Sequence, residues 1–258
     1  MSPITAFATA GLAAFHIAGS LAAAEAPLFP TPLHLVRRVE DPIANTAVEV
    51  DEYCIGNKII TVRGAKTAVV DYEKQEILEI DRAASTYSVA SFADVAQAKS
   101  IADRPNRDRQ IQSDSAREWR TTAFGVRSSL TGRSADSFEI ASNNIRIEVA
   151  VDRQIVLTRA ALDAISGASY PNRATPEQEA IAKASVRANG FGLPLDQTTT
   201  IDVDAKTHLT TRNAIVRVGS ELPPPELLAI PAGATLVDSR AAKMVKQLRE
   251  LEHAQKKP

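Results

Sequence analysis

The sequence predicts an α+β protein built on one open, strongly curved antiparallel β-sheet: a half-barrel of about 9–11 strands with helices on its concave face. Two observations predict this fold. Short runs with apolar residues at every second position recur along the chain, and this period is typical of strands with one buried face. Only three or four segments have helical periodicity, and they do not alternate with the strands as they do in parallel α/β sheets.

The N-terminal segment is expected to be a signal peptide over residues 1–24. It is rich in small and apolar residues, and Ile4–Leu21 contains no charged residue. The sequence around Ala24 suits cleavage, so a periplasmic or secreted protein is expected. The alternative is a retained anchor helix, because the apolar run approaches the roughly 20 residues that cross a bilayer.

The rest of the chain is expected to form one β-rich domain. Residues 25–45 would supply an extended segment and a first strand, with Pro27, Pro30 and Pro32 marking a linker. Residues 46–238 would form the curved sheet with its inserted helices. Residues 239–258 would form a C-terminal helix and a basic tail.

Charge and cysteine content exclude some classes of function. The formal net charge of −1 argues against a nucleic-acid partner. The arginines of Asp103–Arg120 alternate with acidic residues, which is typical of a solvated loop. The single cysteine, Cys54, shares a strand face with Val48 and Val50, so a buried thiol is expected.

Five strands are predicted in the first half of the sheet domain. The polar patches EKQE and DRAAS suit tight turns, so the last three strands form a meander. Ser91 then starts a helix, with Asp94 at its third position. The predicted strands are Thr46–Ile55, Asn57–Arg63, Thr67–Tyr72, Glu76–Asp81 and Thr86–Ser91.

A second set of strands begins at Trp119. After a turn at Ser142–Asn144, the residues Ile145, Ile147, Val149 and Val151 alternate without a break. They are expected to point inward, while Arg146, Glu148 and Asp152 face solvent.

Three further helices are expected. One is Thr158–Ala168, whose apolar stripe is rich in small residues. The next begins with a capping box at Thr175 and Gln178 and ends in a left-handed cap at Asn189–Gly190. After two more partly alternating strands, the helix Ser239–Gln255 closes the chain.

Two stretches resemble a known family. The run VVDYEKQEILEIDRAASTYSVASFADV is similar to a signature of uncharacterised secreted bacterial proteins, in which the pattern D-x-x-K…I-D-x-x-x-x-T-Y leads into a helix. FGLPL and ELLAIPAGATLVD are similar to the closing strand of that family, with Ala234 where an aromatic residue is common. The family resembles the periplasmic carriers of outer-membrane lipoproteins, the lipoprotein localisation factor superfamily. This resemblance implies a half-barrel whose concave face is filled by helices that a lipid chain can replace.

A curled sheet has one concave face lined by every second residue, and the helix Thr158–Ala168 is the expected lid over it. A hydrophobic, lipid-like ligand is therefore the expected partner. Its predicted contacts are Ile80, Tyr87, Val89, Ile147, Val149, Leu162 and Ile165. The alternative is a non-catalytic structural or protein-interaction domain of the cell envelope, with an envelope protein as partner and a concave face filled by its own helices.

Sequence motifs do not indicate an enzyme. No G-x-S-x-G motif is present, and the histidines His16, His34, His208 and His253 stand far apart in the sequence. Asp202 and Asp204 share a strand face, which is more typical of a solvated edge than of a calcium site. No catalytic residue, cofactor or metal is expected.

Overall fold

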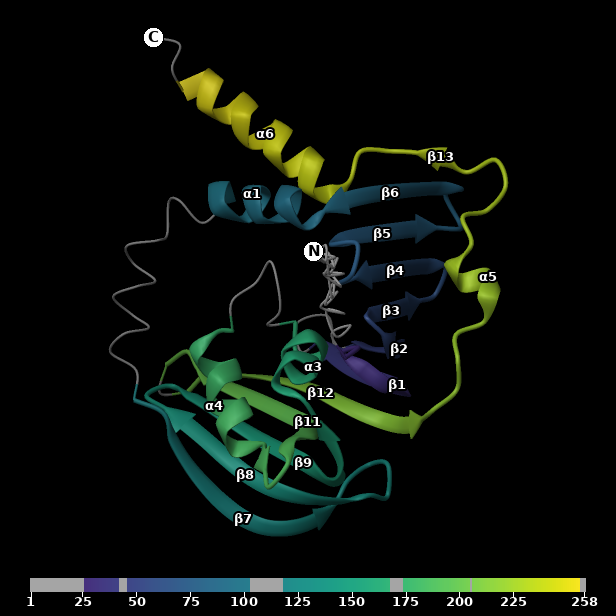
Figure 1. The fold of residues 1–258 in the computed structure, drawn as a ribbon. Coiled ribbons are helices and arrows are strands. Elements are labelled where there is room, and N and C mark those ends of the chain that lie inside the picture. The colour runs from purple at the N-terminus through teal and green to yellow at the C-terminus, as the bar shows by residue number, and fades with distance from the viewer. Residues whose placement is uncertain (1–25, 42–45, 103–117, 168–173, 205, 256–258) are drawn as a thin grey trace, which may run out of the picture.

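The computed structural model describes residues 26–41, 46–102, 118–167, 174–204 and 206–255. Four sequence predictions lie wholly or partly outside these ranges: the signal peptide, most of the polar segment Asp103–Arg120, a predicted chain break at Tyr170–Asn172 and the end of the basic tail. The described part of the chain is a single sheet with five helices (Figure 1).

The sheet has thirteen strands in the order β13-β6-β5-β4-β3-β2-β1-β12-β11-β9-β8-β7, and β10 pairs with β11 off this path. Every pairing is antiparallel except the parallel pair of β13 and β6. The strands are β1 (Phe29–Asp41), β2 (Thr46–Gly56), β3 (Lys58–Arg63), β4 (Lys66–Asp71), β5 (Glu76–Asp81), β6 (Thr86–Ser91), β7 (Arg120–Ser128), β8 (Ser134–Ser142), β9 (Ile145–Leu157), β10 (Val186–Arg187), β11 (Gly190–Asp202), β12 (His208–Gly219) and β13 (Thr235–Leu236). The predicted open antiparallel sheet is confirmed, with the two-residue strands β10 and β13 in addition to the expected number.

The helices are α1 (Phe92–Ala102), α3 (Arg159–Ile165), α4 (Pro176–Ala184), α5 (Pro225–Leu228) and α6 (Arg240–Gln255). The predicted caps of α3 and α4 are confirmed. The hydroxyl of Thr158 accepts from the Ala161 N–H at 3.1 Å, and Thr175 and Gln178 form the capping box. The predicted cap at Asn189–Gly190 is wrong: α4 ends at Ala184, Asn189 lies in the turn between β10 and β11, and Gly190 is the first residue of β11. The short helix α5 was not predicted.

The N-terminal linker prediction is also wrong. Strand β1 begins at Phe29 and pairs with both β2 and β12 in the middle of the sheet. Its register against β2 shifts between Phe29 and Leu33. Pro30 and Pro32 lie within this irregularity, which is where a strand tolerates residues without an N–H donor.

The predicted register of β9 is confirmed except at one residue. Ile145, Ile147, Val149 and Val151 are buried, and Arg146 and Glu148 are exposed. Asp152 is fully buried rather than solvent-facing. The Arg133 guanidinium and the backbone N–H groups of Gln154 and Ile155 hydrogen-bond its carboxylate, so the charge has partners inside the protein.

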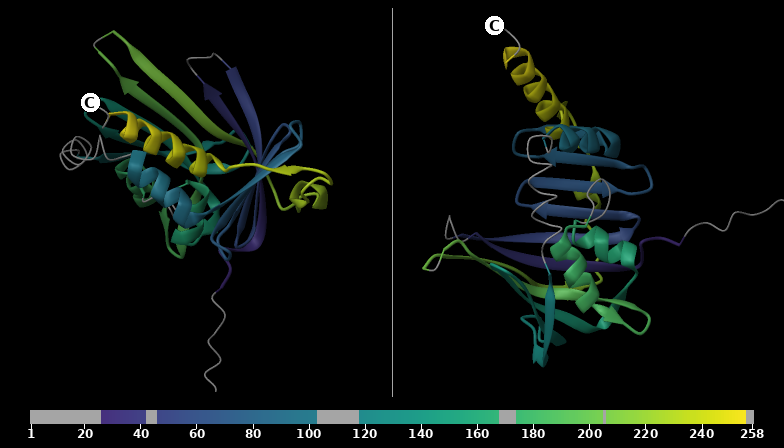
Figure 2. Two further views of the ribbon diagram at one scale, coloured as in Figure 1. Left: turned by 90° about the horizontal axis from the view of Figure 1, so that it is seen from above. Right: turned by 90° about the vertical axis from the view of Figure 1, so that its left-hand side faces the viewer.

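Helices cover both sides of the sheet. The core beneath α3 contains Cys54 and Ile59. The next residues along these strands, Tyr53 and Ile60, point the other way and pack with Val69 and with Leu227 of α5. Figures 1 and 2 accordingly show α1, α3 and α4 on one side of the sheet and α5 on the other.

This arrangement corrects the predicted concave face, on which Ile80, Tyr87 and Val89 of the meander and Ile147 and Val149 of β9 were expected to lie together. Val69 and Leu78 of the meander pack toward α5, whereas Ile147 and Val149 pack with Ile181 of α4. Alternation assigned the right residues to one face of each strand. It did not reveal that the two halves of the sheet turn these residues toward different helices.

Candidate functional site

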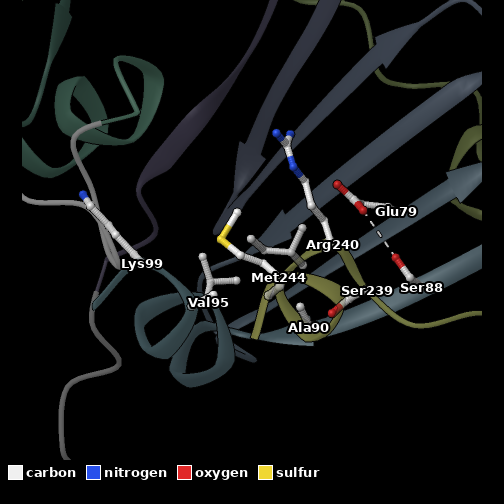
Figure 3. Close-up of a pocket in the computed structure, with 11 residues that line it drawn as sticks. Glu79, Ser88, Ala90, Val95, Lys99, Ser239, Arg240 and Met244 are labelled. Atoms are coloured by element: carbon white, nitrogen blue, oxygen red, sulfur yellow. Dashed lines mark hydrogen bonds between the residues drawn. The ribbon is translucent and has the colours of Figure 1, made fainter. Parts of the chain in front are cut away.

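An apolar cavity lies between the last two strands of the meander and the helices α1 and α6. It has a volume of about 330 Å³, is lined by residues of β5, β6, α1 and α6, and is partly open to solvent (Figure 3). We call it the α1–α6 cavity. Its apolar lining consists of Ile77, Ala90, Val95, Ala98, Ala241 and Met244.

The sequence builds this cavity from three short elements. Ile77 of β5 and Ala90 of β6 are cross-strand partners on the face that α1 covers. The chain enters α1 directly from β6, and Ser91 caps the helix: its hydroxyl accepts from the Asp94 N–H at 3.1 Å, and its own N–H donates to the Asp94 carboxylate. The Ser91 hydroxyl also donates to the Asp94 carboxylate at 2.7 Å, and this bond, followed by the one from the Ser91 N–H, lowers the pKa of Asp94.

Helix α6 closes the other side of the cavity. The Ser239 hydroxyl accepts from the Ala242 N–H at 3.2 Å and starts the helix at the sheet edge. Ala241 and Met244 are three positions apart, so they lie on one helix face and reach the same cavity. Three of the six apolar lining residues are alanines, and their small side chains leave the space open.

The rim of the cavity is polar. The Ser88 hydroxyl donates to the Glu79 carboxylate at 3.3 Å. Lys99 of α1 and Arg240 of α6 lie on opposite sides of the apolar residues in Figure 3. The site therefore has an apolar floor and charged edges, which suits a ligand with an apolar body and a polar end.

A second cavity of about 620 Å³ lies where the sequence predicted the ligand, between α3, α4 and strands β1, β2, β11 and β12. Its lining is mixed. Leu162, Ile165 and Ile181 approach it from the helices, and Arg37 and Glu52 approach it from the sheet. The Arg37 Nε donates to Glu52 at 2.8 Å, and its Nη2 is buried with no hydrogen-bond partner among the described residues.

The structure does not bring the seven predicted ligand contacts together. Leu162 and Ile165 lie side by side on α3, with Leu162 buried in the core. Ile147 and Val149 pack beneath α4. Ile80 and Tyr87 line a polar cavity at the far end of β5 and β6, and Val89 is 46% exposed. Their contact with a ligand stays a prediction.

The α1–α6 cavity itself was not found from the sequence, although the apolar stripes of both helices were. The periodicity around Val95 and around Ala241 and Met244 marked one buried face on each helix. Nothing in that periodicity says that helices about 140 residues apart face each other. In the structure Val95, Ala98, Ala241 and Met244 belong to one apolar cluster.

A charged cluster around His34 was also missed, because its members are distant in sequence. The His34 Nε2 lies 2.9 Å from Asp51 Oδ1, and its Nδ1 lies 3.2 Å from Glu221 Oε2. The ring is only 3% exposed and stacks on Tyr53. Burial, followed by the charge of Asp51, raises the pKa of Tyr53. Gly219 lies opposite His34 in β12, and a Cβ there would collide with the Glu221 carboxylate.

The contacts of this cluster indicate that it stabilises the sheet. The imidazole is closed in by its neighbours, and its two nitrogens are occupied by carboxylates. Within the described ranges, no group of three or more His, Cys, Asp or Glu side chains is arranged to hold a metal ion. None of the described helices is long and apolar enough to span a membrane.

Comparison with known proteins does not identify a family for this chain. No protein-family model matches this chain, and no curated protein matches its sequence. Among solved structures, PNGF-II is similar in two crystal forms, with TM-scores of 0.37 and 0.38, 8% identity and 85% of this chain covered. MucB in complex with MucA(peri) is similar with a TM-score of 0.35 and 13% identity over 80% of this chain.

The chain spans about a third of the length of PNGF-II, with 33% and 34% covered, and 55% of the MucB chain. Similarity at this level gives no basis for assigning a ligand, a partner or an activity.

Proposed function

We propose that this protein binds a hydrophobic ligand in the α1–α6 cavity. The observation that carries the proposal is the cavity itself: about 330 Å³ of space lined by six apolar side chains and bordered by a few polar ones. Pockets that hold small molecules typically have volumes of about 300–1,000 Å³ and this kind of lining.

The energetic argument does not need a polar motif. Each Å² of apolar ligand surface removed from water contributes about 25 cal/mol. An acyl chain that fills the cavity is therefore held mainly by the area that it buries. This supports the lipid-like ligand expected from the sequence, at a different place in the fold.

A thermal-shift experiment tests the proposal. A ligand that binds only the folded protein stabilises it by about 2.7 kcal/mol at a hundredfold excess over its Kd. The melting temperature should be measured with a panel of fatty acids and monoacylglycerols. At least one of these ligands should raise it. Val95→Trp, which fills the cavity from α1, should abolish this ligand-induced increase in melting temperature.

The matched control is Ala93→Trp on the same helix. The Ala93 side chain is exposed and does not line the cavity. This variant should keep the full ligand-induced shift. The proposal fails if no ligand raises the melting temperature, or if Val95→Trp and Ala93→Trp respond alike.

A non-catalytic interaction domain of the cell envelope is the second candidate function, and one observation favours it. Part of the sheet beneath α3 is covered by the protein's own side chains, with Ala161 and Leu162 at most 2% exposed, and the cavity of about 620 Å³ beside them has a mixed polar and apolar lining. The covered part has the self-filled arrangement expected for a protein without a ligand under its lid. If a ligand does enter there, Leu162→Gln should abolish its thermal shift while Val95→Trp leaves it intact.

We also propose that the protein is exported and that it is not an enzyme. A lipid binder of the periplasm or the extracellular space fits the apolar, uncharged stretch at the start of the sequence. Terminal sequencing of protein purified from the extracytoplasmic fraction should then begin at or near Glu25. An intact Met1 on membrane-bound protein would instead identify a retained anchor.

A further inference from the structure

A polar cavity of about 460 Å³ adjoins the α1–α6 cavity, and the two share the lining residues Glu79, Ser88 and Arg240. Side chains from one face of β5 line both cavities, and Ile80 and Tyr87 also border the polar one. On β5, Ile77 lines the first cavity, Glu79 lines both and Asp81 lines the second. Residues two apart on a strand lie about 7 Å from each other, so the lining changes from apolar to charged within a few residues.

Helix α6 repeats this division. Ala241 and Met244 line the apolar cavity, whereas Lys243 lines the polar cavity and Arg240 borders both. Strand β5 and helix α6 therefore both place apolar side chains in the α1–α6 cavity and charged side chains in the polar cavity. A single molecule lying across both cavities would need an apolar tail and a polar head.

The charges of the polar cavity indicate the sign of that head. Its lining has four basic side chains, Arg63, Lys66, Arg240 and Lys243, and three acidic ones, Glu79, Asp81 and Asp238. Lys66 is paired with Asp81 at 3.2 Å, and Glu79 accepts the Ser88 hydroxyl. Within the described residues, Arg63, Arg240 and Lys243 form no ion pair, and neither do Glu79 and Asp238, so the unpaired side chains carry one more positive than negative charge.

We infer that the ligand is an anionic single-chain amphiphile, with its tail in the α1–α6 cavity and its acidic head beside Arg240, Lys243 and Arg63. This inference rests on the proposed function and adds to it the charge and the orientation of the ligand. The three cations are solvent-exposed, so their attraction sets selectivity among amphiphiles more than total affinity.

Titration calorimetry with chain-matched probes tests the inference, using laurate, monolaurin and inorganic phosphate below micelle-forming concentrations. Laurate should bind roughly three- to tenfold more tightly than monolaurin at low ionic strength. The difference should shrink as salt screens the charges. Phosphate, which has the charge but no tail, should bind far more weakly than either.

The double variant Arg240→Gln with Lys243→Gln should bring laurate down to the affinity of monolaurin. Lys183→Gln with Lys206→Gln removes the same net charge from exposed positions that line neither cavity, and it should keep the preference for laurate. Equal losses in the two double variants would show a general effect of net charge and would overturn the inference.

The remaining outcomes separate the inference from the proposed function. If monolaurin binds and laurate binds no better, the acidic head is refuted while the proposed function stands. If phosphate matches laurate, the site recognises an anion alone and the amphiphile is refuted. If no amphiphile binds, the inference and the proposed function fail together.

Discussion

The imidazole of His34 stacks on the phenol ring of Tyr53 across strands β1 and β2, with ring centroids 4.2 Å apart and ring planes inclined by 8°. The ring is buried, but the two carboxylates that contact it are not: the side chain of Asp51 is 41% exposed and that of Glu221 is 61% exposed. The stacking and the hydrogen bonds can therefore be separated by mutation.

His34→Ala should lower the free energy of unfolding by about 2–4 kcal/mol, since it removes a buried ring and leaves a cavity. His34→Phe should recover most of this loss, because it keeps the stacking while water replaces the lost contacts of the exposed carboxylates. Urea denaturation of both variants measures the difference. Equal losses would mean that the hydrogen bonds, not the ring packing, stabilise this part of the sheet.

The ion pair of Arg133 with Asp152 should be among the most sensitive polar contacts. The Asp152 side chain is completely buried, so Arg133→Met leaves a carboxylate that only two backbone N–H groups stabilise. Removing one partner of a buried pair typically costs about 3–5 kcal/mol, and the lower end is expected because Arg133 is partly exposed. Arg153→Met breaks an exposed pair with Asp136 and should cost less than about 1 kcal/mol. Similar costs for the two variants would contradict the prediction.

The same carboxylate should make the protein sensitive to acid. Burial by itself raises the pKa of Asp152, but the hydrogen bonds from Arg133, Ile155 and Gln154 outweigh it and hold the pKa below the ordinary value of 3.8. A carboxyl group with a lowered pKa contributes stability that is fully present above its unfolded-state pKa. That stability is lost as the pH falls through the folded-state value.

Stability measured by urea denaturation between about pH 5 and pH 2 should therefore fall less steeply in Asp152→Asn than in the wild-type protein. The variant is less stable at neutral pH, so the comparison is of slopes. An unchanged slope would show that Asp152 does not contribute to the acid response.

The register of β9 gives a direct test of the sheet. Ile147 is 1% exposed and Glu148, the next residue, is exposed. Ile147→Ala should cost roughly 2–5 kcal/mol, the usual range for a truncated buried isoleucine. Glu148→Ala should change stability by no more than about 0.5 kcal/mol. Chemical denaturation measures the free energy of unfolding of both variants. Equal losses of stability in the two would contradict this register.

The thiol of Cys54 should be unreactive in the folded protein. It is completely buried, and burial, followed by the charge of Glu52, raises its pKa to about 12. The thiolate is the reactive form, so iodoacetamide at neutral pH should modify Cys54 only as fast as the protein unfolds. The fraction of Cys54 that is modified can be measured by mass spectrometry across a series of urea concentrations. This fraction should increase in parallel with the fraction of unfolded protein. Rapid labelling without urea would mean that the strand opens locally.

Local patterns in the sequence determined much of the fold. The meander from Thr67 to Ser91 and the caps of α1, α3 and α4 depend on residues within a few positions of one another. Alternation decides which side chains of one strand share a face, and a cap needs only a side chain and the next turn of backbone. These features were therefore predicted with boundaries close to those of the structure.

The tertiary structure alone decided which distant surfaces meet. Alternation cannot say whether the face that bears Val69 turns toward α3 or α5, nor that α6 returns to cover α1. Asp152 had the sequence pattern of a solvent-facing residue, and only the approach of Arg133 from the connection between β7 and β8 made its burial tolerable. The α1–α6 cavity and the His34 cluster have the same origin. Both are made of side chains far apart in the chain, and the long-range packing that joins them leaves no periodic mark in the sequence.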